Sequence, residues 1–491
     1  MLPDERPVAR PAEIAVLFAA ALVLRCINLD SGLWVDEIFS VVSSFRPPLV
    51  DIITVFPRDN HHPFYSVLAH LCIVAFGEHN WSIRLPSVVF GAATVPMLYV
   101  LGLKLVRRRE AFLSAAFLAA SYHHVWFSQN ARGYAMLGFF AVLGAWLLLR
   151  VLEGGGRRFV IGYAVAMALG SWTHLTMIFV AVGHAAACVI GLLVARRRGR
   201  AVDWKPGATA FVLAAVLTVL LYLPVIGSVS GYFQNRPSGL RGISTNRWAA
   251  LETVRVLLQG LGGAGAAAAV LAVALGGLLF GAGLLSFWKR HPLVLGMFVM
   301  PAVVTVAGAA AARGTMYPRF FFSIAPYFVL VAVRGAFALA DLATRRRLRA
   351  ANEHPAGGGL ATLAVVLLIV LSLASLVRLE YRLPKQAFVE AQHWVEGARR
   401  PGDRVATVDI TTLVYHGYFS AGWDSVRSAA DLVALRSGHP VWLVYAFPRY
   451  LVRGAPEIFE VTERECRDAR TVFRGTVGGG DVNVCQLGPV P

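Results

Sequence analysis

The sequence predicts an all-α bundle of membrane-spanning helices, followed by a small α/β domain outside the membrane. Hydrophobic residues make up 57% of the 491 residues and charged residues only 15%, and apolar runs repeatedly approach or exceed the length that crosses a bilayer. Past residue 379, charged residues are spread throughout and short alternating segments replace the apolar runs. We therefore place a membrane domain at residues 1–379 and an outer α/β domain at residues 380–491.

Basic residues set the expected orientation of the bundle. The net charge of +18 is compatible with a nucleic-acid partner, but the Lys and Arg residues form short clusters between apolar runs, such as 104–109, 196–200 and 345–349. Such clusters are typical of cytoplasmic loops that face anionic lipid headgroups. We expect membrane lipids as partners, no nucleic acid, a cytoplasmic N-terminus and an outer C-terminus.

About eleven spans alternate in direction across the membrane, with the basic clusters on the cytoplasmic side, if the apolar run Phe64–Phe76 lies at the outer surface. This run is short for a span, and a crossing there would put the basic cluster 104–109 outside. The predicted spans are residues 11–29, 85–103, 111–127, 134–151, 159–174, 176–195, 207–226, 265–287, 293–312, 319–340 and 359–378.

The outer domain contains local signals for both strands and helices. Alternating segments predict strands at Arg404–Ile410 and Pro440–Ala446, and we expect helices around Lys385–Ala398 and Ala429–Ser437. Cys466 and Cys485 also lie there. An oxidising compartment permits a disulfide between them, but their spacing does not show whether the side chains meet.

The candidate site begins in the outer loop 30–84, directly after the first span. Residues 30–62 carry five acidic residues against two basic ones in a strongly basic protein, and Asp36 and Glu37 are adjacent. Neighbouring carboxylates at a membrane surface are costly to hold together, so they usually have a cation or a proton-transfer task nearby. We expect Asp36 to be the centre of the chemistry.

Four strings in the first 150 residues carry a resemblance to a known family. They are Trp34-Val-Asp-Glu37, His62-Pro-Phe-Tyr65, Arg84-Leu-Pro-Ser87 continuing through Val95-Pro-Met-Leu-Tyr99, and Ser128-Gln-Asn-Ala-Arg-Gly-Tyr134. In this order they resemble the polyprenyl-phosphate-sugar-dependent glycosyltransferases of the GT-C fold, especially glycosyltransferase family 39 with its protein O-mannosyltransferases and the lipid A aminoarabinose transferases. The later Tyr317-Pro-Arg-Phe320 also looks like that family.

The resemblance implies an inverting transfer of a hexose or pentose from a polyprenyl-phosphate donor to an acceptor glycan, lipid or protein. It also implies a multi-pass protein of the plasma (inner) membrane, with a periplasmic or extracellular C-terminal domain. By position, Asp36 of the Asp-Glu pair lies at the acceptor, with Glu37 beside it as the second catalytic candidate. A direct displacement needs a base on the face opposite the leaving group, which agrees with this role for Asp36.

The departing phosphate needs cations, and Arg suits phosphate through its bidentate fork. Arg132 is the first candidate and Arg319 the second, with His62 and Arg84 as further phosphate-binding candidates. Many relatives carry an acid where this chain has Asn130, so we predict no catalytic metal and no other cofactor.

Other readings of the same residues remain open. A transporter or flippase of a lipid-linked or soluble sugar would use Asp36 as a coupling group, although no internal repeat or matched pair of broken spans supports it. A non-catalytic scaffold is a third possibility. The scaffold reading leaves the Asp-Glu pair without a task. A separate alternative is that Asp36 and Glu37 form structural ion pairs with Arg25 or Arg46.

Overall fold

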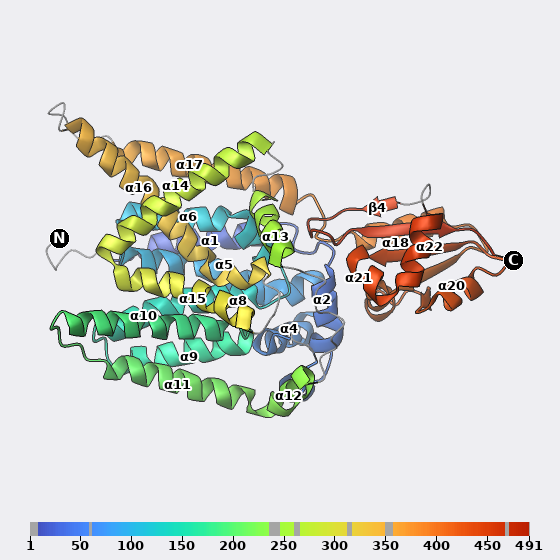
Figure 1. Cartoon of the computed structure of the whole chain (residues 1–491), viewed down its shortest axis with the longest axis horizontal. Helices are drawn as coiled ribbons and strands as arrows, with labels where there is room; N and C mark the ends of the chain where they lie inside the picture. The colour runs from blue at the N-terminus through green and yellow to red at the C-terminus, as the bar shows by residue number, and fades with distance from the viewer. Residues whose placement is uncertain are drawn as a thin grey trace.

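The computed structural model describes residues 8–57, 61–234, 246–259, 266–311, 317–348, 357–466 and 471–490. Figure 1 shows a bundle of long helices joined at one end to a smaller domain that contains the sheet. The N-terminus lies at the far end of the bundle and the C-terminus at the far end of the smaller domain. The predicted architecture of a helical membrane bundle with a C-terminal α/β domain is confirmed.

Eight helical segments in the described part of the chain are long and apolar enough to cross a membrane. Each of the eleven predicted spans overlaps a helix of the bundle, but α1, α6 and α9 are shorter, with 16, 13 and 17 residues. The bundle helices are α1 (Pro11–Cys26), α5 (Asn80–Leu103), α6 (Arg108–Ala120), α8 (Tyr134–Leu152), α9 (Arg157–Thr173), α10 (Met177–Arg197), α11 (Lys205–Tyr222), α14 (Ala266–Arg290), α15 (Pro292–Ala311), α16 (Ala325–Leu348) and α17 (Gly357–Ser375).

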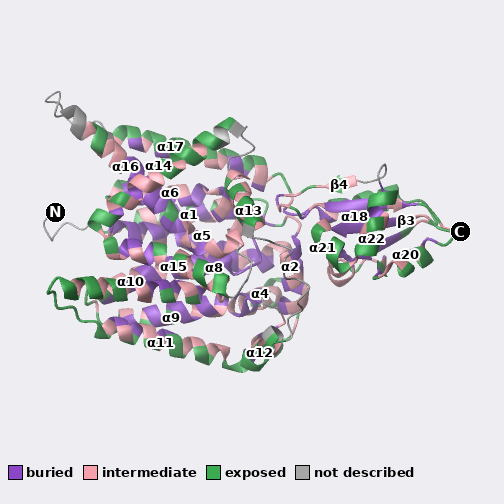
Figure 2. Cartoon of the chain, viewed as in Figure 1, coloured by how far each residue is buried: buried purple, intermediate pink, exposed green. Residues whose placement is uncertain are grey.

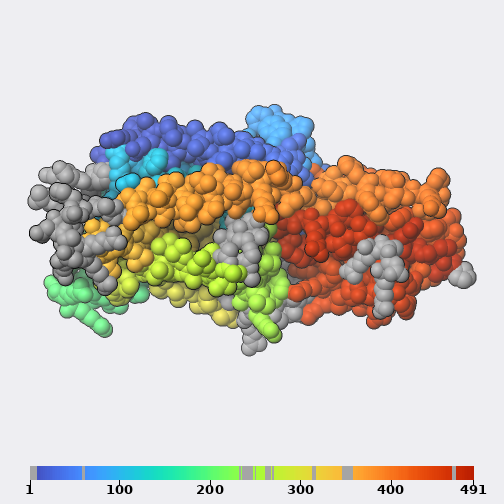
Figure 3. All heavy atoms as spheres, turned by 90° about the horizontal axis from the view of Figure 1, so that it is seen from above, coloured from blue at the N-terminus to red at the C-terminus, as the bar shows by residue number. Residues whose placement is uncertain are grey.

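Burial separates central helices from peripheral ones. Helices α5 and α8 are mostly buried, whereas α11, α14 and α17 expose large apolar side chains such as Val212, Leu271 and Leu363 (Figure 2). An apolar surface of this kind is stable only in a lipid-like solvent. Figure 3 shows α14 and α17 on the same face of the bundle.

Short elements lie at the end of the bundle that faces the outer domain. They are α2 (Val35–Ser40), η1 (Val41–Phe45), α3 (Leu49–Thr54), α4 (Pro63–Phe76), α7 (Tyr122–Ser128), η2 (Leu223–Val225), α12 (Ile226–Gln234), α13 (Asn246–Gln259), η4 (Pro318–Ile324) and η5 (Leu376–Glu380). Helix α4 is the predicted surface run Phe64–Phe76, and it packs beside α3 and η1.

The predicted span 111–127 is wrong as a single helix. Helix α6 ends at Ala120, and Ser121 has an extended backbone (φ −64°, ψ 120°) before α7 begins. Hydropathy does not detect such a bend, because both arms of the run are apolar. The bend brings α7 into contact with α5 and η5.

The outer domain is a five-stranded mixed sheet with helices on both faces. Strands lie in the order β2-β1-β3-β5-β4; β1 is parallel to β2 and β3, and β5 is antiparallel to β3 and β4. The strands are β1 (Arg404–Val408), β2 (Asp424–Val426), β3 (Val441–Ala446), β4 (Thr471–Phe473) and β5 (Val482–Leu487). The helical elements are α18 (Phe388–Ala398), α19 (Ile410–Thr412), η6 (Leu413–Tyr418), α20 (Ala429–Leu435), α21 (Pro448–Gly454) and α22 (Pro456–Glu465).

Alternation along the strands builds two cores. Val405 and Val444 belong to the core that contains Phe388 of α18, whereas Ala406 and Leu443 pack with the helices of the opposite face. The strands predicted at 404–410 and 440–446 correspond to β1 and β3, and the predicted helices to α18 and α20. A disulfide joins Cys466, after α22, to Cys485 in β5.

Candidate active site

The carboxylate pair at the start of α2 divides into two environments. Glu37 has no exposed surface and accepts hydrogen bonds from Arg84 Nε and Nη2, both at 2.8 Å, and from the Ala131 backbone N–H at 2.7 Å. The preceding residue, Asp36, instead lines a large cavity. Glu37 therefore fixes the orientation of α2, and this orientation presents Asp36 to the cavity.

The contacts of Arg84 are with Glu37 and with the backbone of the preceding loop. Its Nη1 donates to the backbone oxygens of Leu29 and Ser31, both at 2.8 Å, and the side chain is fully buried. Burial alone would raise the pKa of Glu37, but the charge and hydrogen bonds of Arg84 hold it below its ordinary value. Neither Glu37 nor Arg84 lines the cavity, so the geometry gives no support to their predicted contacts with substrate.

Arg319 forms an ion pair with Asp36. Arg319 Nη1 lies 3.0 Å from Asp36 Oδ2, and both residues line the cavity. The Arg319 guanidinium also stacks over the Tyr317 ring, 4.6 Å from its centroid. The alternative ion-pair partners lie elsewhere, because Arg46 pairs with Glu78 and Arg25 contacts His124.

Arg132 contacts the last residue of α2, Ser40, and also His62. Arg132 Nη1 donates to Ser40 Oγ at 2.6 Å, and its Nη2 lies 2.7 Å from His62 Nε2. Both residues are buried and neither lines the cavity. Burial and the Arg132 charge lower the pKa of His62 well below its ordinary value, so its imidazole is neutral at pH 7. The structure thus places Arg319, and not Arg132, in the cavity wall.

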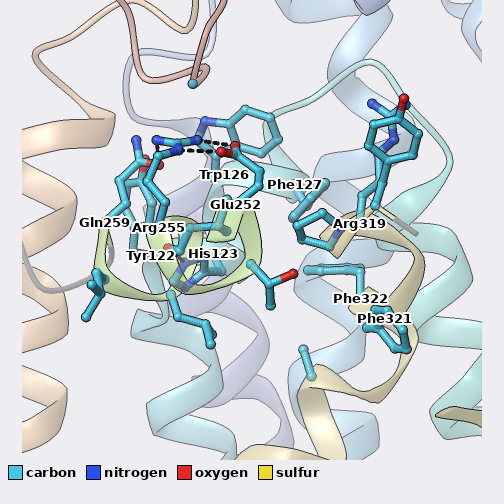
Figure 4. A pocket seen from close by; sticks show the side chains of 18 of the residues that line it. Tyr122, His123, Trp126, Phe127, Glu252, Arg255, Gln259, Arg319, Phe321 and Phe322 are labelled. Atoms are coloured by element: carbon cyan, nitrogen blue, oxygen red, sulfur yellow. Dashed lines mark hydrogen bonds and ion pairs between the residues drawn. The ribbon is translucent and has the colours of Figure 1, made fainter. Parts of the chain in front are cut away.

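The cavity has a volume of about 2510 Å³ and combines a charged end with an apolar limb. The limb runs between α14, α15, α16 and α17, and its lining includes Leu275, Leu279, Phe280, Phe298, Phe328 and Leu371. Figure 4 shows Arg319 and Phe322 on one side of the cavity and Arg255 and Gln259 of α13 on the other, with Trp126 and Phe127 between them.

The outer domain closes the charged end. Gln259 Nε2 donates to the Thr476 backbone oxygen at 2.8 Å, and Trp126 Nε1 donates to Thr476 Oγ1 at 3.1 Å. Residues 476–479 of the outer domain contribute to the cavity lining, as do Phe447, Arg449 and Tyr450. The cavity is therefore built by both domains, which the sequence alone did not indicate.

Two buried residues of the connecting segment tie the domains together at α2. Gln386 Oε1 accepts from the Val35 N–H at 3.0 Å, and its Nε2 donates to the Gly480 oxygen at 2.7 Å. Lys385 Nζ donates to the backbone oxygen of Gln129. Burial is the main cause that lowers the pKa of Lys385. In the sequence, the only sign of these roles is that two polar residues, Lys385 and Gln386, occur in the short segment between the bundle and the outer domain.

Comparison with known proteins finds one matching family model and several solved structures with a similar fold. Residues 60–222 match the model of the family described as dolichyl-phosphate-mannose-protein mannosyltransferase. The structure of ArnT from Cupriavidus metallidurans bound to undecaprenyl phosphate aligns with a TM-score of 0.55 at 13% identity, over 97% of this chain and 98% of that one. No curated protein matches the sequence.

A second similar structure is the archaeal oligosaccharyltransferase AglB from Archaeoglobus fulgidus, in complex with an inhibitory peptide and a dolichol-phosphate. It aligns with a TM-score of 0.55 at 12% identity, over 96% of this chain and 73% of that one. The chain has the GT-C fold. The resemblance predicted from the four strings is thus confirmed, and the family match and the GT-C fold together support a membrane glycosyltransferase.

Within the GT-C fold of this chain, the six predicted site residues form two groups. Asp36 and Arg319 meet in the cavity wall. Glu37, Arg84, Arg132 and His62 are buried around α2, and they hold the helix that carries Asp36.

Proposed function

We propose that the chain is an inverting glycosyltransferase that moves a sugar from a polyprenyl-phosphate donor to an acceptor on the outer face of the membrane, with Asp36 as the base. The observation that carries the proposal is the Asp36–Arg319 pair, 3.0 Å apart, at the charged end of a cavity whose other limb is apolar. A base and a phosphate-binding cation beside an apolar groove are what this transfer needs.

The shape of the cavity supports a lipid-linked donor. The apolar limb suits a polyprenyl chain, and Arg319 at its charged end suits the phosphate that joins the chain to the sugar. The names of the similar structures agree with this reading, since ArnT is bound to undecaprenyl phosphate and AglB to dolichol-phosphate.

Asp36 and Arg319 divide the chemistry between them. Asp36 takes the proton from the acceptor hydroxyl or amine, whose oxygen or nitrogen then forms the bond to the anomeric carbon. The bond between that carbon and the phosphate oxygen breaks on the opposite face, and Arg319 stabilises the negative charge on the departing phosphate. Because the donor phosphate competes for the Arg319 guanidinium, donor binding also frees the Asp36 carboxylate to act as a base.

Release of sugar from a radiolabelled polyprenyl-phosphate mannose tests the proposal, with the full chain in lipid nanodiscs and a membrane extract as the acceptor source. Asp36→Asn keeps the side-chain volume but removes the proton acceptor, so turnover should fall by roughly a hundredfold or more. Asp51→Asn, on the exposed face of α3 in the same outer loop, is the matched control and should keep wild-type turnover. Near-wild-type turnover of Asp36→Asn would refute the assignment.

A further inference from the structure

The outer domain presents its own set of side chains to the cavity that contains Asp36. Asp409 directly follows β1 and Phe447 directly follows β3, and these two strands are parallel neighbours. Tyr450 follows on α21. All three residues line the cavity. In open α/β sheets, ligands bind outside the carboxyl ends of parallel strands, which is where these residues lie.

Both strand ends have a strained backbone. The φ angle is +53° at Asp409 and +52° at Phe447, a region that residues with a Cβ rarely adopt. Such conformations persist only where the surrounding structure enforces them, and they concentrate at functional sites. Two of them at adjacent strand ends, both in the wall of one cavity, point to a ligand at this edge.

The chemistry of the three side chains matches a carbohydrate. The Asp409 residue is exposed to the cavity, and its carboxylate can only accept hydrogen bonds, which sugar hydroxyls donate. The Phe447 and Tyr450 rings lie 5.8 Å apart at 81°, so they offer apolar surface next to a phenol hydroxyl. A sugar ring presents both hydroxyl groups and apolar C–H faces.

The same edge connects directly to the proposed base. The Tyr450 side chain hydrogen-bonds to that of Tyr317, whose ring lies under the Arg319 guanidinium, and Arg319 pairs with Asp36. Figure 1 shows α21 at the end of the outer domain that faces the bundle. A ligand held at the strand ends therefore extends toward Asp36.

We infer that Asp409, Phe447 and Tyr450 form a binding subsite for a carbohydrate acceptor. The inference rests on the proposed function, because it assigns to the sugar at this edge the hydroxyl that Asp36 deprotonates. It narrows the acceptor from glycan, lipid or protein to a molecule that presents a sugar residue to the outer domain.

Binding of methyl glycosides to the full chain tests the subsite without any donor. Saturation-transfer NMR with methyl α-mannoside, methyl β-glucoside and methyl β-galactoside is measured in nanodiscs, because glycoside detergents would compete. We expect at least one glycoside to bind, and Asp409→Asn to weaken its binding at least tenfold. Asp424→Asn, which loses only an exposed pair with Arg404 in the same domain, is the matched control. Absence of binding by all three glycosides, or equal binding to the wild type and Asp409→Asn, would overturn the inference.

A second variant separates binding from folding. Asp409→Gly relieves the positive φ angle, so its Tm should stay the same or rise while glycoside binding is lost. A purely structural role of Asp409 would instead lower the Tm and leave binding to the folded fraction intact, which would contradict the subsite. Glycoside binding without donor turnover in the wild type would overturn the acceptor role together with the proposed function. Donor turnover without glycoside binding would overturn this inference alone.

Discussion

At the scale of the residue, the contact with Arg319 distinguishes Asp36 from the other charged residues of the outer loop. Arg319 lines the cavity, whereas Arg132 contacts Ser40 and His62 and does not line the cavity. The two arginines should therefore differ in what their removal does. Under the proposed function, we expect Arg319 to act on the phosphate and Arg132 to act mainly through Ser40 and the position of α2.

Alanine and lysine substitutions separate these two roles. Arg319→Ala should lower turnover by on the order of a hundredfold and weaken donor binding, because the cation acts on the phosphate in the ground state and more strongly in the transition state. Arg319→Lys should restore only part of the loss, since it keeps the charge without the planar fork. Arg132→Ala should lower thermal stability more than donor affinity. Unchanged turnover per folded molecule in Arg319→Ala would contradict its assignment to the phosphate.

At the scale of the element, α2 is held by an ion pair that lies entirely inside the protein. Both Glu37 and Arg84 are fully buried, and Glu37 also binds the Ala131 N–H. Breaking a buried pair leaves an uncompensated charge, at a cost of about 3–5 kcal/mol. The orientation of Asp36 therefore depends on a pair that does not line the cavity.

Glu37→Gln should consequently lower the Tm strongly and reduce turnover per folded molecule, measured by thermal unfolding and by sugar release. Glu78→Gln is the matched control, because Glu78 makes the same two-point contact with Arg46 but at the surface. Exposed pairs contribute only about 0–1 kcal/mol. Similar losses in the two variants would show that the buried pair has no special role.

His61, which lies just before α4, should also make the folding stability depend on pH. Burial lowers the pKa of His61 to about 4, and the ring contacts Ser44 of η1 at 3.1 Å. Between pH 6.5 and 4 the unfolded chain binds a proton at His61 that the folded protein does not, so stability falls as the pH falls, by roughly 2 kcal/mol at pH 5. The Tm of His61→Gln should therefore fall less between pH 7 and 5 than that of the wild type, whereas His79→Gln, at an exposed position, should follow the wild type.

At the scale of the whole molecule, the proposed transfer requires the outer domain and the loop 30–84 to share one side of the membrane. The contacts of Gln386 with Val35 and Gly480 place them together in the fold, and the basic clusters predict that this side is the outer one. Gly199 lies in a cluster predicted to be cytoplasmic, but its φ of +68° makes a substitution there strained. The exposed Ala201 of the same loop is a better position for an inside probe.

In a background without the exposed Cys26, a cysteine at Ser425 should react with an impermeant thiol reagent applied from outside, and one at Ala201 should not. Labelling of intact cells or sealed right-side-out vesicles measures this, and lysis of the same sample should expose Ala201→Cys. The reverse pattern would mean that the bundle has the opposite orientation.

Local sequence properties predicted most of the helices, but not the bend at Ser121 and not the site. Helices α8 and α10 follow from apolar runs that lead into basic clusters, and β1 and β3 from alternation within a few residues. The pairing of Glu37 with Arg84, by contrast, depends on how α2 packs against α5. Gln386 and Tyr450 lie more than 300 residues after α2 in the sequence, and no local sequence pattern predicts their contacts.

The central claim is that Asp36 acts in the chemical step rather than in donor binding. Single-turnover transfer at saturating donor, measured together with donor affinity in wild type and Asp36→Asn, tests this most directly. We predict a rate at least about a hundredfold slower in Asp36→Asn, with donor affinity equal or tighter because Asp36 no longer competes with the phosphate for Arg319. An unchanged single-turnover rate, or a loss confined to donor affinity, would contradict the claim.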